Sequence, residues 1–86
     1  MTWEGTMYKN RLEGRNNCCG EKIAALRKAY QPKLSQRALA DQLQLMGLDL
    51  DKNAVQRIEA GKRFVTDIEL MAFARFFRVT ADELLR

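Results

Sequence analysis

Two short stretches near the end of the chain indicate where helices begin. "TDIE" (66–69) and "TADE" (80–83) share one pattern, a threonine followed three residues later by a glutamate. In such a capping box the threonine oxygen accepts a hydrogen bond from the backbone N–H of the third helical residue. The glutamate carboxylate accepts one from the threonine N–H. The pattern therefore predicts helices that begin directly after Thr66 and Thr80.

Similar signals divide the preceding residues into three more helices. Ser35 and Asp51 are favourable N-cap residues. Gly47 and Gly61 are favourable residues just beyond a helix end. Together with the spacing of the apolar residues, these signals predict helices over 20–30, 36–46 and 51–60, and two more after the capping boxes. No stretch has the alternating pattern of a half-buried strand, so the sequence predicts an all-α domain of five helices.

The 86 residues suit one small domain, preceded by a polar segment. Residues 1–17 show no sustained period, which predicts a flexible N-terminal arm and places the folded domain at 18–86. No apolar run approaches the ~18 residues that span a bilayer, and none resembles a signal peptide. We therefore expect a cytoplasmic location and no membrane partner.

The residue types that most enzymes and metal sites need are missing from the sequence. Histidine is absent, and the two cysteines, Cys18 and Cys19, are adjacent. They cannot complete a zinc site, and two reduced thiols are the simplest interpretation, with a redox switch as the alternative. There is also no glycine-rich phosphate loop. We expect no metal, no cofactor and no enzymatic activity.

The helix over 51–60 has two faces of opposite character. Residues on one side are apolar: Ala54, Val55 and Ile58. Residues on the other side are polar, with no carboxylate among them: Lys52, Asn53, Gln56 and Arg57. Arginine and lysine bind guanine edges, asparagine and glutamine bind adenine edges, and a helix fits the major groove. The polar face is therefore either a DNA-reading surface or a solvated basic face.

The positive charge is concentrated around this helix. The chain carries a net charge of +4. Residues 21–63 hold nine basic and five acidic residues, which gives +4 for this segment alone. Such a distribution favours an anionic partner.

Four stretches occur in the order and spacing of a known family. They are "IAALR" (23–27), "LSQRALADQL" (34–43), "NAVQRIEAGKR" (53–63) and "VTADELL" (79–85). They resemble the DNA-binding domains of phage repressors and Cro-like regulators, the Xre family of helix-turn-helix proteins. The resemblance implies a compact five-helix domain that binds double-stranded DNA. It also implies a transcriptional repressor that acts as a homodimer on a palindromic operator.

The resemblance assigns roles to individual residues. The expected base contacts are Gln36, Lys52, Asn53 and Arg57, to which the helix face adds Gln56. The expected contacts to the sugar–phosphate backbone are Ser35, Arg37, Lys62 and Arg63. Ala40 matches the small residue that lets the third helix pack closely. Arg27 and Glu59 match an ion pair between the first and third helices, although two unrelated surface charges are the alternative.

The chain departs from the family pattern in its connectors. The stretch "QLMGLDL" (44–50) is longer than the usual turn, so we expect a longer second helix, a looser connector and a tilted third helix. The connector between the first two helices is also longer than usual. Arg78 stands where a glycine often ends the fourth helix. A left-handed conformation at Arg78 would cost ~1 kcal/mol, so a different exit from that helix is expected.

Two other functions are compatible with the same sequence. The chain could be the antitoxin of a toxin–antitoxin pair, with a toxin protein as its partner, or a protein-interaction module that does not bind DNA. For a homodimer, the candidate contact residues are Phe76, Phe77 and Leu85. A place in the core is the alternative for these residues and the favoured one for Phe77.

Overall fold

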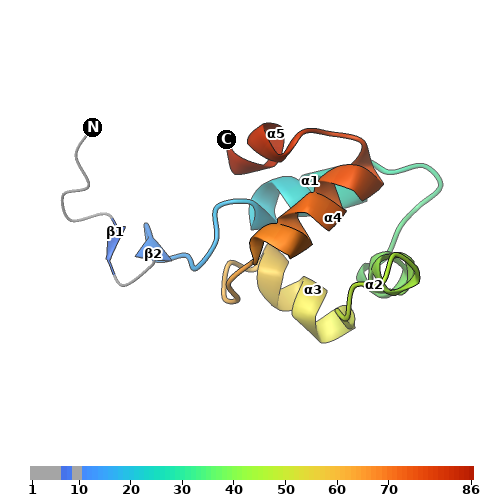
Figure 1. The fold of residues 1–86 in the computed structure, drawn as a ribbon, viewed down its shortest axis with the longest axis horizontal. Coiled ribbons are helices and arrows are strands. Elements are labelled where there is room, and N and C mark those ends of the chain that lie inside the picture. The colour runs from blue at the N-terminus through green and yellow to red at the C-terminus, as the bar shows by residue number, and fades with distance from the viewer. Residues whose placement is uncertain (1–6, 9–10) are drawn as a thin grey trace.

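Five helices form where the start and stop signals predict them. A computed structural model describes residues 7–8 and 11–86 of the chain. In this part of the chain the helices are α1 (Gly20–Ala29), α2 (Gln36–Leu45), α3 (Lys52–Glu59), α4 (Asp67–Phe77) and α5 (Ala81–Leu85) (Figure 1). The prediction of an all-α, five-helix domain is confirmed. None of these helices has the length and apolar character needed to cross a bilayer.

The predicted caps are formed at four of the helices. The Ser35 and Asp51 side chains accept hydrogen bonds from the N–H groups of Ala38 (3.0 Å) and Ala54 (2.8 Å). Both capping boxes are complete, at Thr66 and at Thr80. Each cap satisfies a backbone donor that the first turn of a helix leaves without a partner.

The core lies where the five helices meet. Its largest fully buried side chains are Phe73, Ile23, Leu39, Leu43, Leu50, Ile58, Leu84 and Val55. Ala40 is also buried, on the helix that packs most extensively against α3. This placement agrees with the role that the family resemblance implies for it. The small side chain allows two helices to approach closely.

The connector between α2 and α3 is held firmly, so the prediction of a loose connector is wrong. Gly47 adopts a positive φ of 91°, and the N–H of Leu48 donates to the Leu43 carbonyl at 3.0 Å, which closes the end of α2. The Gln44 side chain donates to the Leu50 carbonyl at 2.9 Å, and Leu50 itself is buried. The extra residues are therefore anchored at both ends of the connector.

α4 ends in the left-handed turn that glycine usually provides. Arg78 has φ 57° and ψ 43°, and the following N–H, of Val79, donates to the Ala74 carbonyl at 3.0 Å. The expectation of a different exit at this position is wrong, because the turn is kept with a side chain that disfavours it.

Replacing Arg78 with glycine is expected to raise the free energy of unfolding by up to ~1 kcal/mol. Glycine removes the contact between Cβ and the carbonyl oxygen, although it also loosens the unfolded chain. Urea denaturation followed by circular dichroism measures the change. Arg78→Ala is the matched control, because it removes the charge and keeps Cβ. Equal stability of the two variants would contradict a backbone cause.

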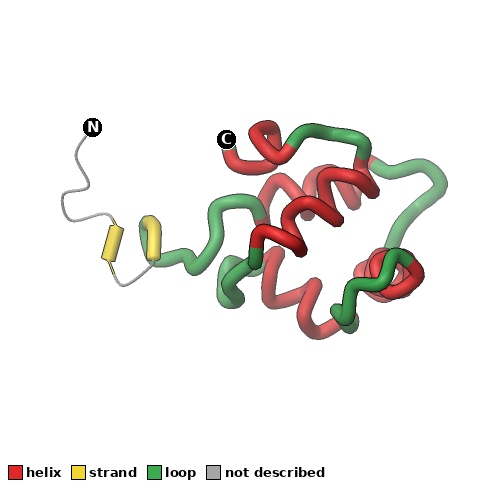
Figure 2. Tube along the Cα trace, in the orientation of Figure 1, coloured by secondary structure: helices red, strands yellow, loops and turns green. Residues whose placement is uncertain are grey.

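The segment before α1 contains a small hairpin that the sequence pattern did not predict. Strand β1 (Met7–Tyr8) pairs antiparallel with β2 (Arg11–Leu12), shown as yellow elements in Figure 2. Residues 1–6 and 9–10 of the predicted flexible arm lie outside the described residues. The arm's flexibility therefore stays a prediction.

Candidate nucleic-acid interface

α3 presents its two faces as the sequence predicted. Val55 and Ile58 are fully buried against the rest of the domain. The four polar residues of the opposite face are all exposed: Lys52, Asn53, Gln56 and Arg57. Within the described residues, neither Lys52 nor Arg57 forms an ion pair. α3 lies along the lower edge of the domain in Figure 1, and none of the described helices is drawn below it.

α2 borders this face and contributes its N-terminal end. A cleft of ≈ 340 Å³ separates the first turn of α3 from α2, with Arg37 and Lys52 among its lining residues. The Ser35 oxygen caps α2, which leaves the hydroxyl hydrogen available for an acceptor. N-terminal amides of a helix also favour a phosphate group. Asp41 and Asp51 line the same cleft, so its lining carries charges of both signs.

Gln36 is positioned by a hydrogen bond to the ion pair that links α1 and α3. Glu59 accepts hydrogen bonds from Arg27 Nε at 2.7 Å, Arg27 Nη2 at 3.1 Å and Gln36 Nε2 at 2.9 Å. The Arg27–Glu59 pair is confirmed, and the hydrogen bonds that Arg27 donates to the Glu59 carboxylate raise the pKa of Arg27. One Gln36 N–H is therefore engaged inside the protein. Its amide oxygen has no partner among the described residues and remains free to accept.

Arg63 is held against α4 by an acidic partner. Its guanidinium donates to both Glu69 oxygens, at 2.9 and 3.0 Å, and to the Phe64 carbonyl at 2.9 Å. The hydrogen bonds from Arg63 lower the pKa of Glu69, whose carboxylate also completes the capping box of α4. Arg63 therefore anchors the loop after α3 to α4, and few of its donors remain for a phosphate.

Two residues before α1 hold the C-terminal end of α3. The Asn17 side chain donates to the carbonyls of Ile58 (3.0 Å) and Arg63 (2.8 Å) and accepts from the N–H of Gly20 (2.8 Å). Arg15 donates to the Glu59 carbonyl at 3.1 Å. These bonds satisfy carbonyls that a helix end leaves without partners. Arg15, inside the segment assigned to the arm, thus already contacts the helical domain.

The loop that carries Lys62 is fixed by the same segment. Asn16 donates from its backbone to the Gly61 carbonyl at 2.8 Å and from its side chain to the Lys62 carbonyl at 3.0 Å. The Lys62 side chain is exposed. The loop backbone is therefore held in place, while the ammonium group points to solvent beyond the end of α3.

The two cysteines differ in their surroundings. Cys18 is exposed and Cys19 is buried, and both are free thiols. Burial, followed by the neighbouring Cys18, raises the pKa of Cys19 to about 11. Cys19 is thus a neutral thiol at pH 7, which suits a core residue better than a reactive one.

Comparison with known proteins identifies the domain. A family model described as "Helix-turn-helix" matches residues 23–84, from the first turn of α1 to α5. The match includes α2, α3 and the loop that carries Lys62. No curated protein and no solved structure matches the chain.

Proposed function

Because the chain belongs to the Cro/C1-type (Xre) helix-turn-helix family, we propose that it is a sequence-specific repressor that inserts α3 into the major groove of an operator. Domains of this family bind DNA and are typically not enzymes. The observation that carries the proposal is the outer face of α3, which is polar, exposed and free of carboxylates, and whose two cations, Lys52 and Arg57, form no ion pair with any residue that the structure describes.

The residues around α3 would make different kinds of contact with DNA. Asn53 and Arg57 lie one turn apart on the exposed face, where they can form paired hydrogen bonds to adenine and guanine edges. Lys52 and Gln56 complete this face. Contacts to the phosphates would come from residues at the two flanks: Ser35, Arg37 and Lys62. Arg63 would act mainly by holding the loop in place, because Glu69 and the Phe64 carbonyl occupy most of its donors. Gln36, held by Glu59, would instead present its free amide oxygen to the DNA.

The proposed target is a palindromic operator bound by two copies of the chain in the cytoplasm. One domain of this size offers a short reading surface, and two related half-sites double both the contacts and the sequence that is read. Repression would follow from occupancy of the operator. No cofactor is needed for this binding mode, because all of its donors and acceptors are side chains and backbone groups of the chain.

Substitutions on and beside α3 test the proposal. Arg57→Ala is expected to weaken binding to the selected operator by ~1–3 kcal/mol and to relax the preference at one base pair. Lys62→Ala is expected to weaken binding to all sequences alike and to lower the salt slope by about one. The operator is first recovered by selection from a random duplex pool. Affinities for it and for a scrambled duplex are then measured at several salt concentrations.

Lys22→Ala is the matched control, because Lys22 lies at a groove between α1 and α5 rather than beside α3. It should leave both affinities unchanged. If Arg57→Ala leaves the ratio of specific to scrambled binding intact, α3 is only a solvated basic face. A wild-type chain that shifts no duplex at low salt would favour the protein-interaction alternative.

A further inference from the structure

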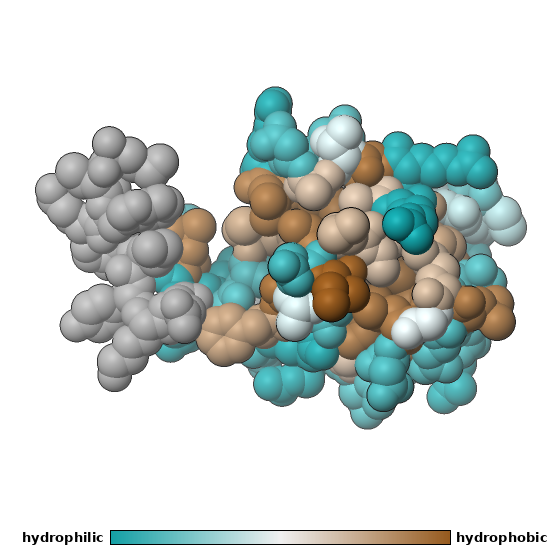
Figure 3. Space-filling model, viewed as in Figure 1, coloured by the Kyte–Doolittle hydropathy of each residue, from teal (hydrophilic) through white to brown (hydrophobic). Residues whose placement is uncertain are grey.

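The outer face of α4 carries large apolar side chains that are exposed to solvent. Ile68 is 69% exposed and Met71 is 58% exposed, and Met46, from the end of α2, is 39% exposed. Figure 3 shows hydrophobic side chains gathered in the middle of the face toward the viewer. Contiguous exposed apolar surface in a small domain indicates an interaction site.

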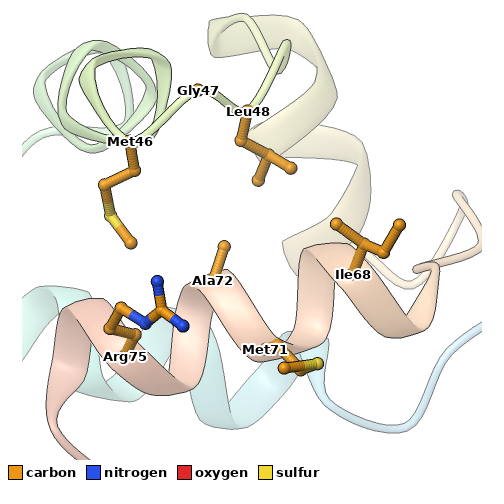
Figure 4. Close-up of a pocket in the computed structure, with 7 residues that line it drawn as sticks. All are labelled: Met46, Gly47, Leu48, Ile68, Met71, Ala72 and Arg75. Atoms are coloured by element: carbon orange, nitrogen blue, oxygen red, sulfur yellow. The ribbon is translucent and has the colours of Figure 1, made fainter.

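This surface is hollowed into a groove. The turn after α2 forms one wall, and α4 forms the other, with a volume of ≈ 240 Å³ between them. In Figure 4, Met46 and Leu48 extend from the turn toward α4, and Arg75 lies at the Met46 end. Among the residues that the structure describes, Arg75 is the only charged one that lines the groove. The wall formed by the turn contains the residues in which this chain departs from the usual family connector.

The charges on α4 are placed at the two ends of the apolar face. Asp67, Met71 and Arg75 are four residues apart, so they lie on one side of the helix over a length of ~12 Å. Asp67 and Arg75 are both exposed. Within the part of the chain that the structure describes, neither takes part in an ion pair. The face therefore presents an acid, an apolar centre and a base in a row.

Such a row is complementary to itself when a second copy is turned by 180°. In a two-fold interface the same patch meets itself, so residue i contacts j and j contacts i. If two α4 helices cross antiparallel with Met71 at the axis, Arg75 of each copy faces the partner's Asp67. The Met71 and Ile68 side chains of the two copies then cover each other. We propose that the outer face of α4 is the homodimer interface of this protein.

The other candidate surface for a homodimer contact, formed by Phe76, Phe77 and Leu85, is less free to bind a second copy. Phe76 and Phe77 pack with Tyr30 in an aromatic cluster, with ring centroids 5.3 Å (Tyr30–Phe76), 6.1 Å (Tyr30–Phe77) and 5.1 Å (Phe76–Phe77) apart. They serve the fold rather than a partner. Leu85 remains exposed at 47%, but only as a single side chain.

The proposed interface leaves α3 available for DNA. α4 crosses the face toward the viewer in Figure 1, whereas α3 lies along the lower edge of the domain. Two copies joined face to face through α4 therefore both keep α3 uncovered. Only this arrangement on DNA rests on the proposed function, because the dimer itself can be tested without DNA.

Charge reversal tests the antiparallel register directly. Asp67→Arg places two pairs of like charges across the interface, and Arg75→Asp does the same. Each variant alone is therefore expected to be monomeric in sedimentation experiments. In an equimolar mixture the two variants restore both opposite-charge pairs. The mixture is expected to form a one-to-one dimer with at least ten times the affinity of either variant for itself. This restoration requires the residue pairing that the proposal specifies.

Substitution at the axis provides a second, independent measurement. Met71→Glu brings two carboxylates together and is expected to weaken the dimer at least tenfold, whereas Leu85→Glu, the matched control on the other surface, is expected to leave it intact. Circular dichroism melting confirms that each variant is folded. On DNA, Met71→Glu should still bind a single half-site duplex like wild type and should lose the added affinity for the palindromic selected operator.

Three results would overturn the interface. They are a wild-type chain that stays monomeric at high concentration, Leu85→Glu as the only disruptive substitution, or charge-reversal variants that fail to pair in the mixture. Failure of the wild-type chain to bind any duplex would instead reject the proposed function, while the sedimentation results would still decide the interface.

Discussion

Replacing Gly20 with alanine is expected to lower the free energy of unfolding by about 3 kcal/mol. Gly20 is the first residue of α1, and it lies against the C-terminal end of α3. A Cβ atom at this position would overlap the Ile58 carbonyl oxygen and would lie 2.8 Å from the Asn17 Oδ1 and 3.0 Å from the Ile58 carbonyl carbon. Two of these atoms belong to the backbone, so a rotamer change cannot remove the overlap.

The expected consequence is separation of α1 from α3. Asn17 bonds both to the Gly20 N–H and to the Ile58 carbonyl, so the shift would also stretch the contacts that hold the end of α3. Urea denaturation measures the loss. Gly14→Ala is the matched control, because its Cβ would meet no heavy atom within 4 Å and only its φ of 80° is unfavourable. Equal losses for the two variants would contradict the steric argument.

The helices could be predicted because their signals are local. A cap such as Ser35 and the amide that it accepts from lie within three residues of each other, and both are visible in the sequence. The split between the two faces of α3 is equally local, since it follows from the helical repeat alone. The Arg27–Glu59 pair was predicted from the helical spacing of Arg27 together with the family resemblance, because 32 residues separate its members and no local signal joins them.

The contacts that position the site could not be predicted in the same way. Asn17 bonds to backbone carbonyls more than forty residues ahead, and a carbonyl group carries no side-chain signal. Arg63 looked like a free cation because its partner, Glu69, lies across a loop rather than at a helical spacing. The firm connector depends on Gln44 and Leu50, whose roles become evident only when the turn has formed. Sequence reasoning thus missed the tertiary contacts made by the polar groups of loop residues, while the DNA contact expected of Arg63 stays a prediction.

The ion pair between α1 and α3 is the second site where a large loss of stability is expected. Arg27 and Glu59 have side chains that are only 13% and 8% exposed, and they meet at 2.7 Å. Arg27 also donates to the Leu34 carbonyl at 3.1 Å, so the pair links α1, α3 and the connector before α2. Removal of one member leaves the other charge shielded from water without its partner, which costs ~3 kcal/mol or more.

Glu59→Ala and Arg27→Ala are therefore each expected to lower the free energy of unfolding by about 3 kcal/mol, whereas the double variant should lose clearly less than the sum. Urea denaturation of the four proteins gives the coupling directly. Asp82→Ala is a suitable control, because it breaks the exposed pair with Arg86, where a loss of no more than ~0.5 kcal/mol is expected. Additive losses in the cycle would mean that the two side chains do not interact.

Glu59→Ala should also free Gln36 from its hydrogen bond. At a temperature where this variant remains folded, its affinity for the selected operator should therefore change more than the affinity of Arg27→Ala does. That comparison separates the stability of the domain from the placement of α2 on DNA, because both variants lose the ion pair and only one removes the partner of Gln36.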